Sequence, residues 1–129
     1  MKKISEFENF FKIACDDLKL VEKNLSDQEI SRQLLFFHLQ QATEKFLKAL
    51  LAKKNVNFPK IHDIEKLIEL CEENNIKVPD FIDDLIDLTP FAVEFRYGLI
   101  MEESIDIENY FEKVEKFKTV VENSIYGDL

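Results

Sequence analysis

The sequence predicts an all-α protein, an antiparallel up-and-down bundle of four to five helices. The chain has 129 residues but only two Gly and three Pro, which leaves few breaks for a many-stranded fold. Apolar residues recur at steps of three and four along most of the chain, as amphipathic helices require. No internal repeat, low-complexity tract or linker divides the chain, so we expect residues 1–129 to form one domain.

The first predicted helix carries a single apolar stripe and reaches about Leu25. Ser26 and Asp27 follow, and these residue types form turns and cap helix N-termini, so the second helix should begin near residue 27. The stripe consists of Phe7, Phe11, Ala14, Leu18, Val21 and Leu25.

The second predicted helix covers about residues 27–54 and has one broad apolar arc at 100° per residue. Asn55 and Asn57 with Pro59 should end it, because they favour turns over continued helix. The arc consists of Leu35, Leu39, Ala42, Phe46, Ala49 and Leu50.

A shorter third helix should follow His62-Asp63 and end at Asn74-Asn75. Asp63 suits a helix N-terminus because its charge complements the helix dipole. The buried face of this helix is expected to be Ile64, Leu67, Ile68 and Cys71.

A fourth helix should begin at Pro79-Asp80 and break or kink near Leu88-Thr89, since Pro90 cannot donate a backbone hydrogen bond. A short helical piece up to Gly98 and a last helix over about residues 106–124 complete the expected bundle. The inward residues of these segments are Ile82, Leu85, Ile86, Phe91, Phe95, Tyr110, Val114, Phe117 and Val121.

The net charge of −9 is distributed unevenly along the chain. Residues 41–68 hold six Lys or Arg against three Asp or Glu, whereas residues 69–129 hold five against sixteen. Phosphates would meet an acidic field over most of the molecule, so we expect no DNA binding and disfavour RNA as a partner. The only net-positive segment contains the C-terminal half of the second helix.

The location and the absence of a cofactor are also predicted from composition. The first 25 residues carry acidic groups and no apolar signal region, and no apolar run is long enough to span a membrane. Cys15 and Cys71 lack metal-ligand or redox spacing, so we expect reduced, partly buried thiols in a cytoplasmic protein. No Gly-rich phosphate loop or nucleophile triad is present, so no catalytic residue, metal or cofactor is predicted.

The candidate site lies on the second helix, beside its apolar face. His38, Gln41, Lys45 and Lys48 fall within an arc of about 80°, with Glu44 close to them. One interpretation is a solvated face with an i,i+4 ion pair between Glu44 and Lys48. The other is a groove in which the ammonium groups and an amide hold a phosphate-bearing ligand or the carboxylates of a partner.

Two further pairs are candidates. His62-Asp63 could titrate together, although a helix-capping role for Asp63 is the simpler interpretation. Arg96-Tyr97 follows the Pro-interrupted helix, and Arg96 could bind a ligand or pack its stem among the neighbouring aromatic residues and pair with an acidic group.

Three stretches in this order resemble the HEPN domain family (higher eukaryotes and prokaryotes nucleotide-binding). They are FFHLQQATEKFLKALL at 36–51, KIHDIEKLIELC at 60–71 and FAVEFRYG at 91–98. The first is the most specific, and Gly98 stands where the family usually has Pro. The resemblance covers essentially the whole chain. It implies a bundle of four or five helices, commonly a homodimer, often encoded beside a minimal nucleotidyltransferase.

The resemblance implies a function as well. His38, Gln41, Glu44, Lys45, Lys48, His62, Asp63, Arg96 and Tyr97 would then line a groove for a nucleotide phosphate or a nucleotidyltransferase surface. Some relatives are ribonuclease toxins that use an Arg followed four to six residues later by a His, and in such pairs the nucleotidyltransferase can attach a nucleotide to a tyrosine, here Tyr97. No His follows Arg96. Arg32 and His38 have a similar spacing, but on the wrong helix.

We therefore expect a non-catalytic helical binding module, the partner of a minimal nucleotidyltransferase in a pair of the toxin–antitoxin type. Two alternatives stay open. One is an enzyme, such as a ribonuclease toxin. The other is a homodimeric interaction protein without a small-molecule ligand, in which the polar residues form a network that sets helix register or the dimer interface.

Overall fold

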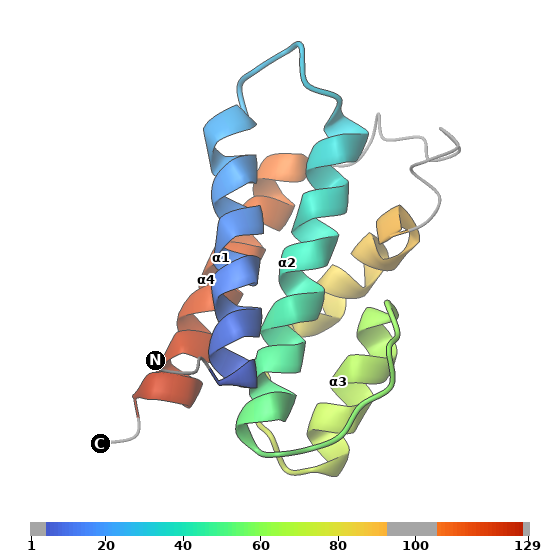
Figure 1. Ribbon diagram of the computed structural model, residues 1–129. Helices are drawn as coiled ribbons and strands as arrows, with labels where there is room; N and C mark the ends of the chain where they lie inside the picture. The colour runs from blue at the N-terminus through green and yellow to red at the C-terminus, as the bar shows by residue number, and fades with distance from the viewer. Residues whose placement is uncertain (1–4, 93–105, 128–129) are drawn as a thin grey trace.

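The computed structural model describes residues 5–92 and 106–127, and these residues form helices and no strand (Figure 1). The predicted all-α bundle is therefore confirmed. In chain order the elements are α1 (Glu6–Asn24), α2 (Arg32–Lys53), α3 (Ile64–Glu73), the 3-10 helix η1 (Asp80–Ala92) and α4 (Ile107–Tyr126).

Helix α2 is the centre of the bundle and packs against α1, α3, α4 and η1. In Figure 1 it lies between α1 and α4 on one side and α3 and η1 on the other. Its broad apolar arc explains this position, because a helix that is apolar around most of its circumference must be covered on most sides. Phe36, Phe46 and Leu47 of α2 are fully buried.

The start of α2 differs from the prediction, because the helix begins at Arg32 and not near residue 27. Ser31 is its N-cap, and the Ser31 hydroxyl accepts a hydrogen bond from the Gln33 backbone N–H at 3.1 Å. Asp27 instead closes a turn before the helix, since its Oδ1 accepts from the Glu29 N–H at 2.9 Å. Ser26 and Asp27 thus supply turn chemistry, while a later serine caps the helix.

Both α2 and α3 end as predicted, at an asparagine with a positive φ. The φ angle is 59° at Asn55 and 58° at Asn75. After α3, the Ile76 N–H donates to the Cys71 carbonyl at 2.9 Å and the Asn75 N–H to the Glu72 carbonyl at 3.2 Å. This is the Schellman pattern, which satisfies the last carbonyl groups of a helix and needs a residue that tolerates the left-handed region.

Substitution of Asn75 tests this helix end. The left-handed backbone conformation is higher in free energy for Ala than for Asn. Asn75→Ala should therefore lower the free energy of unfolding by about 1 kcal/mol. Asn75→Gly should leave it unchanged or raise it slightly. Urea unfolding followed by circular dichroism measures both. Asn57→Ala, in the exposed connection after α2, is the matched control and should stay within about 0.5 kcal/mol of wild type.

The connection between α2 and α3 runs back along α2. It leaves the C-terminal end of α2 at Lys53 and reaches the middle of that helix, where the Gln40 side chain donates to the His62 carbonyl at 3.4 Å. In Figure 1 this segment passes below α3 and rises beside it to the point where α3 begins. Asp63 then caps α3 as predicted, since its Oδ1 accepts from the Lys66 N–H at 3.3 Å. The return of the chain covers one side of α2.

The predicted break before Pro90 is wrong, because η1 continues through Pro90 to Ala92. The fixed φ of proline, about −65°, lies within the range of a 3-10 helix, so Pro90 removes a donor without blocking the backbone. Tyr110 of α4 donates to Asp87 of η1 at 3.0 Å. Burial, together with this hydrogen bond, raises the pKa of Tyr110 to about 12. The hydroxyl therefore remains a donor that ties α4 to η1 at neutral pH.

Candidate functional site

Helix α2 carries a row of polar side chains on its interior. Gln40 and Thr43 are fully buried, Glu44 is 2% exposed and Lys48 is 8% exposed. A buried polar group that has no hydrogen-bond partner destabilises the folded state. Thr43 finds one locally, because its hydroxyl donates to the Leu39 carbonyl at 2.9 Å. The other three meet in a network centred on Glu44.

Both carboxylate oxygens of Glu44 are engaged. Oε1 accepts from Gln40 Nε2 at 3.1 Å and lies 2.8 Å from His62 Nδ1, while Oε2 accepts from Lys48 Nζ at 3.1 Å. A carboxylate only accepts hydrogen bonds, so His62 Nδ1 must carry a proton in this contact. Two of the partners sit one turn to either side of Glu44 on α2, and the third arrives from the returning connection. The third hydrogen bond to Glu44 therefore forms only when that connection is in place.

A second part of the network extends from Gln40 to α1. Gln41 Nε2 donates to Gln40 Oε1 at 2.7 Å, and Lys45 Nζ donates to Gln41 Oε1 at 2.6 Å. Lys45 Nζ also lies 3.9 Å from Asp17 Oδ2, and Asp17 Oδ1 lies 3.0 Å from His38 Nδ1. Lys45 and Asp17 form an ion pair, but 3.9 Å is too long for a hydrogen bond. Asp17 Oδ2 therefore accepts no hydrogen bond from the described residues.

We call these residues the α2 network. They connect the returning chain segment to α2 and α2 to α1. The members are Asp17, His38, Gln40, Gln41, Glu44, Lys45, Lys48 and His62.

The interpretation of this face as solvated is wrong for Glu44 and Lys48. The predicted i,i+4 ion pair exists, but the two side chains are only 3% and 10% exposed. The centroid of the Phe58 ring lies 5.9 Å from Lys48 Nζ, and the ring helps to cover the ammonium group. Four cavities on the described part of the molecule are lined by residues outside the network. The polar atoms of the network are mostly engaged with one another.

His62 differs from the rest of the network because its side chain is 62% exposed. Glu44 fixes the Nδ1 side of the imidazole, and much of the ring faces solvent. Its sequence neighbour Asp63 caps α3, and the carboxylate that contacts His62 is that of Glu44. Lys60 and Lys66 are exposed on either side of His62 in the chain. Asp63 and Glu65 also lie between these two lysines in the chain, so both signs of charge occur close to His62 in sequence.

Two network residues were missed as site residues by sequence reasoning. Gln40 stands in the same motif as Gln41, but its burial follows from the returning connection, which the sequence does not reveal. Asp17 lies on α1, 21 residues before His38, and no local pattern pairs them. Arg96 and Tyr97 lie outside the described residues, so their predicted approach to this site stays a prediction.

The described residues offer little other chemistry. Burial raises the pKa of the Cys71 thiol to about 12 and also raises that of Cys15, so neither is a ready nucleophile at neutral pH. No group of His, Cys, Asp and Glu within residues 5–92 and 106–127 is arranged to hold a metal ion. No helix in this part of the chain is long and apolar enough to cross a membrane.

Comparison with known proteins identifies the family. A search of curated proteins and a search of solved structures each found no match. A sequence model described as the HEPN domain matches residues 7–124, which is nearly the whole chain. This match supports a helical module with a nucleotide- or RNA-related function. The protein belongs to the HEPN domain family.

Proposed function

We propose that the protein is a non-catalytic helical binding module that receives nucleotide phosphates and acts as the partner of a minimal nucleotidyltransferase. The observation that carries this proposal is the contact between Glu44 and His62. A carboxylate that is 3% exposed orients an imidazole that is 62% exposed. A buried charge is costly, and here it presents a hydrogen-bonding group at the surface.

Exposed lysines near His62 in the chain support phosphate binding, with Asp63 and Glu65 lying between them. Lys45 and Lys48 are held by Asp17 and Glu44, so their charges are largely balanced. The exposed lysines that remain in residues 41–68 are Lys54, Lys60 and Lys66. Lysine ammonium groups bind phosphate as point charges, and an imidazole oriented by a carboxylate can donate to a phosphate oxygen. We call the exposed residues Lys60, His62 and Lys66, which are close together in the chain, the basic edge.

The two histidines of the chain favour binding over catalysis. A ribonuclease of the Arg–His type would need a His after Arg96, and the sequence has only His38 and His62. His38 Nδ1 contacts Asp17 at 3.0 Å, and its side chain is 22% exposed. Arg32 lines a cavity at the end of the bundle that does not include His38. The Arg32–His38 pair therefore lacks the shared site that the ribonuclease reaction needs.

A homodimeric interaction protein is the second candidate. Ile13 and Leu20 are 37% and 40% exposed, and they lie two helical turns apart on the same side of α1. A second copy could cover this side. This candidate predicts a stable dimer that shows no response to nucleotides. A tagged pull-down with mass spectrometry separates the two proposals. A nucleotidyltransferase that co-purifies in stoichiometric amount supports the binding module, whereas a homodimer with no other protein supports the interaction protein.

Nucleotide binding at the basic edge can be measured by titrating ATP into the protein and following the heat. We expect Lys60→Ala/Lys66→Ala to weaken ATP binding about tenfold, because charge-assisted hydrogen bonds to phosphate are lost. Lys77→Ala/Lys116→Ala removes the same charge from exposed positions elsewhere and should change the affinity by less than about threefold.

The basic-edge variant leaves every hydrogen bond of the α2 network in place, so loss of folding would not explain its result. If both double variants weakened ATP binding equally, the loss of affinity would follow from net charge alone. That result would contradict a specific phosphate site. Wild-type protein that binds neither ATP nor any other nucleoside triphosphate would overturn the proposal outright.

A further inference from the structure

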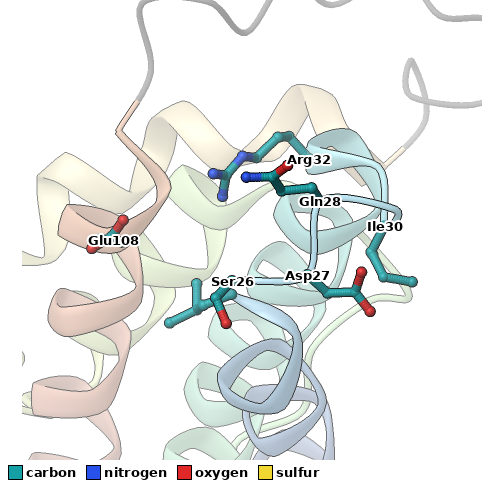
Figure 2. Close-up of a pocket in the computed structure, with 7 residues that line it drawn as sticks. Ser26, Asp27, Gln28, Ile30, Arg32 and Glu108 are labelled. Carbon is teal, nitrogen blue, oxygen red and sulfur yellow. The ribbon is translucent and has the colours of Figure 1, made fainter.

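A second candidate site lies at the opposite end of α2 from the returning connection. A cavity of about 580 Å³ opens where the α1–α2 connection meets the first turn of α4. Ser26, Gln28 and Arg32 line one side of it, and Glu108 of α4 lines the other. Figure 2 shows the side chains of Arg32 and Gln28 extending toward the side from which Glu108 projects, while Asp27 and Ile30 point away.

Three exposed polar side chains of this cavity have no partner among the described residues. Among the described residues, the side chains of Gln28, Arg32 and Glu108 form no hydrogen bond or ion pair, and the guanidinium and the carboxylate remain apart. This contrasts with the α2 network, in which each ammonium group has an oxygen partner. A guanidinium and a carboxylate on two sides of a cavity can bind two different edges of one ligand.

The walls of the cavity are held by local hydrogen bonds. The Asp27 carboxylate fixes the turn that carries Gln28, and Ser31 caps the helix that begins with Arg32. On the other side, Asp106 Oδ1 accepts from the Glu108 N–H at 3.0 Å and sets the first turn of α4. Each side chain therefore starts from an ordered backbone, which lowers the entropy lost when a ligand binds.

We propose that this cavity binds a guanine base. Guanine presents two acceptors, O6 and N7, on one edge, and a guanidinium donates to both at once. Its N1–H and N2–H₂ groups lie on another edge and can donate to a carboxylate. Arg32 and Glu108 supply those two partners, and Gln28 adds an amide that can donate or accept. Leu25 provides an apolar contact for the ring.

The same groups disfavour other ligands. Asp27 and Glu108 outnumber Arg32, so the cavity has a net negative charge and repels phosphate. Adenine would place its N1 acceptor against the Glu108 carboxylate, where guanine places a donor. The site thus goes beyond the phosphate contact proposed above, and it stands on different residues at a different place on the molecule.

The test is a titration of ¹⁵N-labelled protein with guanosine, which carries no phosphate, followed by nuclear magnetic resonance. We expect chemical-shift changes at residues 25–32 and at Glu108, and affinity for adenosine at least about tenfold weaker. Arg32→Ala and Glu108→Gln should each weaken guanosine binding about tenfold. Glu112→Gln, one turn further along α4 and outside the cavity, is the matched control and should bind as wild type does.

Several results would overturn the guanine site. They are the absence of guanosine binding, equal affinity for adenosine, chemical-shift changes confined to other residues, and full binding by Arg32→Ala. Binding of glycine in place of guanosine would show that the cavity selects a zwitterion and would also overturn it. Failure here leaves the ATP test of the basic edge unaffected, because guanosine has no phosphate. Failure of the ATP test leaves the guanosine result standing.

Discussion

Replacing Glu44 with alanine should lower the free energy of unfolding by about 3–5 kcal/mol, the range for breaking a buried ion pair on one side. The change removes the acceptor for Gln40, Lys48 and His62 together. Lys48, which is 8% exposed, would then keep a charge with no carboxylate beside it. Guanidinium-induced unfolding of wild type and variant, followed by circular dichroism, measures the loss.

The chain supplies a matched control in the pair of Lys12 and Asp16. This pair has the same i,i+4 spacing and a similar distance, 3.3 Å, but its side chains are 70% and 69% exposed. Asp16→Ala should therefore cost less than about 1 kcal/mol. Similar losses for Glu44→Ala and Asp16→Ala would show that burial adds nothing to the pair, and the description of the α2 network as a buried structural element would then be wrong.

The double variant Glu44→Leu/Lys48→Met separates stability from function. Apolar residues of similar volume often replace a buried ion pair without loss of stability. The double variant should therefore recover much of the stability that Glu44→Ala loses. It should still bind ATP more weakly than wild type, because His62 loses the group that orients it. Unfolding and ATP titration of the same sample provide both values.

Replacing Phe46 with alanine should cost about 3–5 kcal/mol, the usual range for deleting a fully buried phenyl ring. Phe46 is 0% exposed and lies where α1, α2 and α4 meet. Its ring centroid is 5.6 Å from that of Phe11 and 6.0 Å from that of Phe117. The loss of the ring leaves a cavity that three helices cannot close without moving.

Two further variants sharpen the Phe46 prediction. Phe46→Leu keeps much of the volume and should cost clearly less than Phe46→Ala. Ile13→Ala removes an apolar side chain that is 37% exposed on α1 and should cost at most about 1 kcal/mol. Urea unfolding at equal protein concentration ranks the three variants. A loss below about 1.5 kcal/mol for Phe46→Ala would contradict the central packing of α2.

The sequence predicted those features of the fold that depend on residues close together in the chain. The apolar spacing identified the helices and their buried faces, as with Val114, Phe117 and Val121 of α4. Asp63 and Asn75 marked the two ends of α3, because capping depends on a few adjacent residues. The start of α2 was misplaced, since Asp27 and Ser31 are both competent caps and the helix begins after the later one.

The α2 network could be predicted only in part, because its contacts join residues that are distant in sequence. His62 meets Glu44 across 18 residues and His38 meets Asp17 across 21. Helical spacing placed Gln41, Lys45 and Lys48 on one side of α2, but it could not show that the chain returns along that side and buries it. The break expected at Pro90 assumed an α-helix, in which proline clashes with the preceding turn. This segment is a 3-10 helix and continues through Pro90.

The most direct test of the proposed phosphate site is to follow the imidazole signals of the two histidines while ATP is added. The chain contains only His38 and His62, so each carbon-bound proton can be assigned with single substitutions. We predict that the signals of His62 shift in proportion to saturation while those of His38, paired with Asp17 on the other part of the network, stay in place. Unmoved His62 signals at saturating ATP would contradict the proposed role of the basic edge.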